Sequence, residues 1–287
     1  MVRRRRSNRP ADTHFFARCN AQDMHLTRLA IPVATRAPGG ATNAYLLGDE
    51  SAVLVDPAAR TDELDRAVRT RDVEHVLVTH THPDHVGAVD AYAAETDATV
   101  WARYGHAERF REATGVDPDR TFTPGTSIPL GDDRVRVFDA PGHAPDHVAL
   151  EAGRDGPILC GDCAVREGSV VVGAPEGDMR AYVTTLRRLW AADPPALHPG
   201  HGPEIDASRE TLERLLTHRK RREEKILEAV DAGADTLEEI LEMAYEKDLS
   251  GVRDLARATV VAHLEKLDVE GRVRWDGERA VPAARTD

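Results

Sequence analysis

The sequence of 287 residues predicts an α+β fold, in which β-sheets are covered by helices and a smaller helical part follows. Short strand-like segments come in pairs before residue 60, and strands then alternate with helices as far as about residue 205. The remaining chain is heavily charged and has helical spacing. Hydrophobic residues make up 41% of the chain, which is enough for a sizeable core.

Strands and helices of the first half are predicted from apolar runs and turn residues. Strand character begins at Met24, and the turn Gly48-Asp49-Glu50 joins two strands into a hairpin whose second strand ends at Asp56. Helices are expected where apolar residues lie about four apart, as Leu64 and Val68 do. The expected strands are 43–48, 52–56, 76–79 and 99–102, the expected helices are 61–72, 86–95 and 103–113, and residues 114–133 are turn-rich.

The second half continues with strands and ends in helices. Strands are expected at 134–139, 147–151, 157–160 and 196–197, and a helix at 178–192. A charged helix around 217–224 is expected to bridge two domains. Three apolar stripes at helical spacing follow, and Asp276-Gly277 favours a tight turn between two short strands. Three helices and a terminal hairpin are typical of a winged helix.

These patterns divide the chain into three parts. Residues 1–23 have no periodic apolar pattern and are expected to form a disordered basic arm, 24–215 form the larger domain, and 216–287 form a winged-helix-like domain. No apolar segment follows the arginine run at 3–6, so the arm does not resemble a secretory signal. Met24 is a candidate for the true start of translation.

Charge and cysteine content indicate the environment. The formal net charge is −12, and only four of the 38 basic residues are lysines. An acidic surface of this kind indicates either a salt-adapted (halophilic) organism or a GC-rich genome. No apolar run reaches the roughly 18 residues that a membrane helix needs. Three cysteines fit a reducing, cytoplasmic location. Cys160 and Cys163 spell C-x-x-C, as a redox or zinc pair would, but buried strand packing is favoured.

The segment His80-Thr-His82-Pro-Asp84-His85 places four metal-ligand side chains within six positions. Two histidines separated by one residue can share a metal, and the following Asp and His can hold a second metal beside it. Imidazole and carboxylate ligands suit zinc, with iron and manganese as alternatives. The pattern therefore predicts a metal site, which we expect to hold two zinc ions.

Three further segments place ligand-type residues beside glycines at the ends of predicted strands. They are Pro141-Gly142-His143, Gly161-Asp162 and Pro199-Gly200-His201-Gly202. Together with His80–His85 and Asp56, they resemble the metallo-β-lactamase superfamily over residues 24–205. The resemblance implies a four-layer αββα sandwich with a dinuclear site along one edge.

The resemblance also implies a role for each residue. His80, His82 and His143 would hold the first metal, Asp84, His85 and His201 the second, and Asp162 would bridge both. Asp56 would support these ligands from behind. The nucleophile would be a hydroxide that bridges the metals, and Asp84 would orient that water or accept its proton. The catalytic residues expected on this basis are Asp84 and Asp162.

The remaining histidines are expected to be structural, because lone histidines are usually not ligands. His147 is expected near the mouth of the site and His198 packed at a strand end. Surface or helix-face positions are expected for His75, His106, His218 and His263.

The C-terminal part bears on the substrate. The stretch HRKRREEKIL at 218–227 and the winged-helix pattern resemble the beta-lactamase-like protein 2 group, whose characterised members cleave single-stranded RNA. Residues 223–287 nevertheless have a net charge of −8, whereas a domain that grips phosphates should be basic on one face. Only His218–Arg222 offers a basic patch, and a solvated helix end explains that patch equally well.

Four functions remain open at this point. The first is a metal-dependent hydrolase acting on RNA or another phosphodiester, and the second is a thioester hydrolase resembling glyoxalase II (hydroxyacylglutathione hydrolase). The third is a winged-helix binding module without catalysis. A β-lactamase is disfavoured because the sequence shows no export signal. The partner is thus a small-molecule ester or thioester, or RNA, without a membrane, and the sequence leaves the oligomeric state open.

Overall fold

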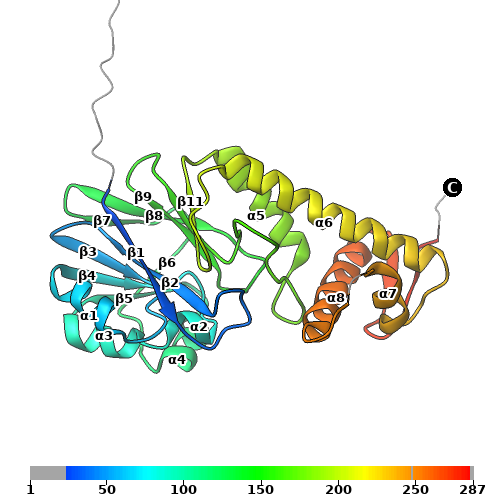
Figure 1. Ribbon diagram of the computed structural model, residues 1–287, viewed down its shortest axis with the longest axis horizontal. Helices are drawn as coiled ribbons and strands as arrows, with labels where there is room; N and C mark the ends of the chain where they lie inside the picture. The colour runs from blue at the N-terminus through cyan, green and yellow to red at the C-terminus, as the bar shows by residue number, and fades with distance from the viewer. Residues whose placement is uncertain (1–23, 247, 285–287) are drawn as a thin grey trace, which may run out of the picture.

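Two β-sheets face each other and bear helices on their outer faces, which gives the four layers expected (Figure 1). The computed structural model describes residues 24–246 and 248–284, so the predicted arm at 1–23 lies outside the described residues. The first sheet has the order β1 (Leu26–Pro32), β2 (Ala41–Leu47), β3 (Ser51–Val55), β4 (Asp72–Leu77), β5 (Thr99–Arg103) and β6 (Arg120–Phe122). The second has the order β11 (Leu197–Pro199), β10 (Ile158–Gly161), β9 (Val148–Ala152), β8 (Asp133–Asp139) and β7 (Ser127–Leu130).

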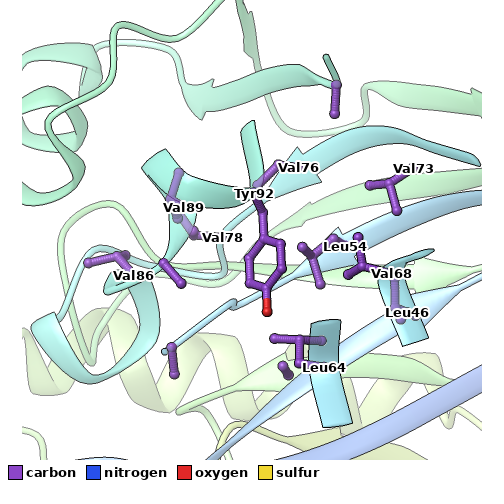
Figure 2. Close-up of a cluster of buried hydrophobic side chains, with 14 of the residues drawn as sticks. Leu46, Leu54, Leu64, Val68, Val73, Val76, Val78, Val86, Val89 and Tyr92 are labelled. Carbon is purple, nitrogen blue, oxygen red and sulfur yellow. The ribbon is translucent and has the colours of Figure 1, made fainter. Parts of the chain in front are cut away.

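Three hydrophobic clusters hold the layers together. One lies between the two sheets, and the other two lie between each sheet and its helices. The helices α1 (Asp62–Arg69), α3 (Val89–Thr96) and α4 (Ala107–Thr114) cover the first sheet, and α5 (Met179–Ala192) and α6 (Ser208–Asp231) cover the second. Figure 2 shows the ring of Tyr92 among Leu54, Leu64 and Val76. Complete burial of a leucine or valine side chain, such as those around Tyr92, contributes about 1.5–3 kcal/mol to stability.

The C-terminal part has a core of its own. It contains the end of α6, α7 (Leu237–Ala244), α8 (Arg253–Val269), β12 (Val273–Trp275) and β13 (Ala280–Pro282). A capping box between Thr236 and Glu239 begins α7. As Figure 1 shows, α6 extends from the sandwich to α7 and α8. Residue 216 lies inside α6, so the two predicted domains share one continuous helix.

Element boundaries differ from the prediction in several places, and β4 begins four residues before the strand expected at 76–79. The turn-rich segment 114–133 contains β6 and β7, which are only three and four residues long and have no extended apolar pattern. The helix expected at 86–95 is divided into α2 (Pro83–Val86) and α3, with Gly87 between them. A side chain at Gly87 would collide with the Ala58 carbonyl oxygen, 2.4 Å from its Cβ. The bridging helix and the first apolar stripe are a single 24-residue helix.

The segment His218–Arg222 is only partly solvated, because two of its lysine and arginine side chains are exposed and two make internal contacts. Arg219 is buried, donates a hydrogen bond to the Val170 carbonyl oxygen, and lies over the ring of Tyr182. Arg222 is half-buried and lies 3.5 Å from the ring centroid of Tyr245. Two of the arginines are therefore committed to internal contacts, which charge counting along the sequence does not reveal.

His263 lies on a helix face, as expected, but this face points inward. It is completely buried on α8, where Nδ1 lies 3.4 Å from a carboxylate oxygen of Glu223 on α6. His198 is buried beside Tyr45, as expected for a packed strand end. No helix among the described residues is long and apolar enough to cross a membrane.

Candidate metal centre

All seven predicted ligand residues meet at one edge of the sandwich. The parallel strands β3, β4 and β5 end at this edge, as do β8, β10 and β11 of the second sheet. Each ligand follows the end of one of these strands or lies in α2. Potential ligand atoms lie within 4.8 Å of one another in three groups: His80, His82 and His143; His80, His85 and Asp162; and Asp84, His85 and His201.

The first trio presents three nitrogen lone pairs to one point. The Nδ1 atom of His82 lies 2.9 Å from Nε2 of His80 and 2.9 Å from Nε2 of His143. Each opposite ring nitrogen faces an acceptor: Glu176 Oε2 at 2.9 Å for His82, and the Val171 carbonyl at 2.7 Å for His143. The outer nitrogens therefore hold the protons, and the inner ones are free to bind a metal.

His80 follows the same rule through Thr79. The Thr79 hydroxyl donates to Asp56 Oδ2 at 2.7 Å, so it accepts a hydrogen bond from His80 Nδ1 at 3.1 Å. Nε2 of His80 thereby keeps its lone pair. Burial, followed by the neighbouring histidines, lowers the pKa of His80 well below its usual value, so that its imidazole stays neutral. Three neutral imidazoles that converge in this way fit a divalent cation.

The group of Asp84, His85 and His201, which we call the second group, is arranged in the same way. Nδ1 of His85 donates to Asp56 Oδ2 at 3.0 Å, and Nδ1 of His201 donates to the Ala41 carbonyl at 2.9 Å. Their Nε2 atoms lie 3.4 Å apart, and that of His201 lies 3.5 Å from Asp84 Oδ2. Burial lowers the pKa of His85, but Asp56, Asp162 and Asp84 together raise it to about 9. A proton therefore occupies this position until a metal displaces it.

Asp162 lies between the two groups. Its Oδ2 is 3.5 Å from His143 Nε2 and 3.4 Å from His201 Nε2, and its Oδ1 is 3.7 Å from His85 Nε2. Burial opposes ionisation of Asp162, but the three histidines lower its pKa overall. Among the described residues its buried Oδ1 has no hydrogen-bond partner. This free oxygen, together with the surrounding imidazoles, fits a shared carboxylate between two cations.

Asp56 accepts three hydrogen bonds at the back of the centre. Besides those from His85 and the Thr79 hydroxyl, Oδ1 accepts the Thr79 backbone N–H at 2.6 Å. The residue is buried and has φ of 50°, a left-handed conformation that few non-glycine residues adopt. Backbone strain of this kind concentrates at functional sites. Asp56 thus lies where the resemblance implies, behind the ligands.

Glycines beside the ligands are required by close approach. A Cβ atom at Gly200 would lie 2.5 Å from Asp162 Oδ1 and 2.7 Å from Cε1 of His85. At Gly161, φ is 47° and a Cβ would lie 2.6 Å from Nε2 of His147. A larger residue at Gly200 would displace two predicted ligands, and one at Gly161 would displace the His147 ring that accepts the Asp162 backbone N–H.

Three residues that were not predicted as ligands support the centre. His147, expected only near the mouth, is completely buried, and its Nε2 accepts the backbone N–H of Asp162 at 2.9 Å. Glu176 and Arg109 had no recognisable signal, because their partners are distant in sequence. Arg109 makes two hydrogen bonds of 2.9 Å to Glu176, which in turn holds His82.

The two cysteines of the C-x-x-C segment are separate from this chemistry. Cys160 and Cys163 are free and buried. Burial raises the pKa of the Cys160 thiol to about 12, which makes it a poor nucleophile. These features agree with strand packing, the interpretation favoured from the sequence.

Comparison with known proteins gives matches over both parts of the chain. The metallo-beta-lactamase superfamily profile matches residues 37–201, and that of the beta-lactamase associated winged helix domain matches residues 236–280. A beta-lactamase-like protein 2 homolog of Drosophila melanogaster is 29% identical, with 81% of this chain and 84% of that protein covered. An atrochrysone carboxyl ACP thioesterase of Paecilomyces divaricatus is 25% identical, with 84% and 78% covered. The crystal structure of a metallo-beta-lactamase family protein from Thermus thermophilus has a TM-score of 0.73 and 25% identity, and covers 90% of this chain and 98% of that one.

Proposed function

The chain belongs to the metallo-β-lactamase superfamily and is a metal-dependent hydrolase, and we propose that it hydrolyses thioesters at a centre for two zinc ions. The observation that supports two ions is the pair of ligand groups on either side of Asp162. One ion would be held by His80, His82 and His143. The other would be held by Asp84, His85 and His201. Asp162 would be available to both.

The residues of the centre have separate roles in hydrolysis. Two divalent cations bound here would lower the pKa of a bound water molecule and would polarise the substrate carbonyl. The side chain of Asp84 is 18% exposed, against 12% for that of Asp162, so Asp84 is the more accessible carboxylate. We assign Asp84 to orienting the attacking water and accepting its proton. Asp56 and His147 keep His85 and the Asp162 backbone in place.

A thioester suits the charge of this protein and the groups available. A thiol has a pKa of about 8.5, so a thiolate leaves with little help from a general acid. A small acyl substrate also needs no extended basic surface. The ACP thioesterase that covers most of this chain at 25% identity supports the same substrate class.

Cleavage of single-stranded RNA is the second candidate. It is favoured by the combination of this catalytic fold with a winged helix, the arrangement shared with the beta-lactamase-like protein 2 homolog. The net charge of −12 weighs against it, because phosphate binding depends on arginine and lysine. The internal contacts of Arg219 and Arg222 weigh against it further, since they remove part of the basic patch.

A metal analysis combined with a substrate panel tests the proposal. Metal content is measured by mass spectrometry, and rates are compared for S-lactoylglutathione, an acyl-carrier-protein thioester, bis-p-nitrophenyl phosphate and single-stranded RNA. We expect two zinc ions per chain and the highest kcat/KM for a thioester. Iron or manganese in the purified protein would replace zinc in the proposal.

Two variants connect the activity to the centre. His143→Ala should abolish turnover and leave the protein folded. His25→Ala changes a half-exposed histidine that faces Asp49, outside the three ligand groups, and should leave turnover unchanged. RNA cleavage without thioester hydrolysis would reject the proposed substrate, and full activity of His143→Ala would reject the proposed centre.

A further inference from the structure

The loop that precedes α5 supplies acceptors to two of the three histidines in the first trio. We call residues 164–178 the bridging loop. Its Val171 carbonyl accepts from Nδ1 of His143, and its Glu176 carboxylate accepts from Nε2 of His82. These bonds keep protons on the outer nitrogens and thus leave the inner lone pairs for a metal. The position of the bridging loop therefore controls the orientation of the His82 and His143 rings toward the metal site.

The C-terminal helices hold the bridging loop from the opposite side. Arg219 of α6 is 3% exposed and donates to the carbonyl of Val170, the residue next to Val171. The Ala174 N–H donates to the Ala258 carbonyl of α8 at 3.1 Å. Gly173 lies so close to α8 that a Cβ there would approach the Cβ of Ala258 to 2.7 Å. Figure 1 shows α6 extending past α5 to α8, so the contacts of the loop with α6 and with α8 come from helices that pack together.

The ligands of the second group are held by the sandwich alone. His85 donates to Asp56 at the end of β3, and His201 donates to the carbonyl of Ala41 in β2. Arg36 and Asp254 form another link between the sandwich and α8, but their side chains are 57% and 64% exposed. An ion pair exposed in this way is screened by solvent and contributes little. Loosening of the bridging loop should therefore affect one metal and spare the other.

We propose that the winged-helix part, acting through the bridging loop, sets the affinity of the His80–His82–His143 trio for its metal. This inference rests on the metal centre of the proposed function. It gives the acidic C-terminal part a role that requires no contact with nucleic acid. Arg219 and Gly173 act in it as positioning residues, because they reach the metal ligands only through the loop. Loss of such outer support typically weakens metal binding about 10- to 100-fold.

Metal affinities of the full-length protein test this proposal. Zinc is titrated against a chromophoric chelator for the wild type, Arg219→Met and Gly173→Ala. His82→Ala and His201→Ala identify which binding step belongs to which group. We expect both loop variants to bind the first metal about 10-fold or more weakly and to bind the second as the wild type does.

A matched control separates this effect from a general loss of stability. Arg222→Met removes another partly buried arginine of α6, whose contacts are the Ala244 carbonyl and the Tyr245 ring inside the C-terminal part. It should keep wild-type affinity for both metals, even if its melting temperature falls. Arg219→Lys retains a donor for the loop and should recover most of the lost affinity.

The possible results decide between the two proposals. Wild-type affinity in Gly173→Ala and Arg219→Met would overturn the role of the winged-helix part and leave the metal centre intact. An equal loss in Arg222→Met would overturn the proposed action through the bridging loop, because Arg222 contacts only the C-terminal part. Absence of zinc binding by the wild type would reject the centre itself. If Arg219→Met does not fold, Gly173→Ala decides alone, because it adds only one methyl group.

Discussion

Replacement of Asp56 by asparagine tests how the second metal site is organised. Asparagine tolerates the left-handed conformation of this position, with φ of 50°, so the backbone should be retained. The carboxylate accepts three hydrogen bonds, whereas an amide offers one oxygen and an NH2 donor. The fixed Thr79 N–H at 2.6 Å requires the amide oxygen, so the NH2 group must face His85. Nδ1 of His85 then becomes an acceptor, and its proton moves to Nε2, where the metal should bind.

The size of the effect follows from this exchange. Loss of the proper tautomer should weaken the second metal about 10- to 100-fold, which corresponds to about 1.4–2.7 kcal/mol. The first metal should be weakened as well, because the Thr79 hydroxyl donates to the same Oδ2, would accept from the new NH2 group instead, and would then donate to Nδ1 of His80. The metal-free protein should also lose about 1–3 kcal/mol of stability through the imperfectly paired buried groups.

Chelator competition and urea denaturation measure both quantities. Asp97→Asn is the matched control, since Asp97 is exposed, has φ of 56°, and lies at the end of α3. It should leave metal binding and stability unchanged. Unaltered affinity for both metals in Asp56→Asn would refute the assignment of the His85 proton and with it the role of Asp56.

Three other predictions concern pH, thiol reactivity and the core. In the metal-free protein the pKa of His85 is about 9, so below this pH a metal must displace a proton from the imidazole. Metal affinity at the second site should therefore rise from pH 7 to 9 and level off above pH 9. A metal affinity that does not change with pH in chelator competition would contradict this. Cys160 should resist thiol reagents at pH 8 until urea is added, because burial raises the pKa of its thiol to about 12. Labelling is measured in a Cys19→Ser background. Rapid labelling of the folded protein would be inconsistent with this packing. Leu54→Ala should cost about 2–5 kcal/mol in urea denaturation, since Leu54 is completely buried between sheet and helices, and a loss below about 1 kcal/mol would show that this core is not tightly packed.

The local order of residues allowed much of the fold and the cluster of candidate ligands at 80–85 to be predicted, whereas the set of seven ligands came from the resemblance to a known family. His80, His82, Asp84 and His85 lie in one short segment, so their proximity in space follows from chain connectivity. The strand–glycine–ligand pattern at His143, Asp162 and His201 could be recognised in the same way. The short strands β6 and β7 could not be predicted, because three or four residues are too few to show a period.

The sequence by itself determined which side chains are available as ligands and that helices follow the sandwich. Only the tertiary structure decided what stands behind each ligand, because hydrogen bonds to distant groups have no local signature. Glu176 lies 94 positions from His82, and the acceptor for His201 is a backbone carbonyl 160 positions away. Packing likewise decided that Arg219 is internal, since a charged residue in a charged segment resembles a solvated one until its neighbours are known.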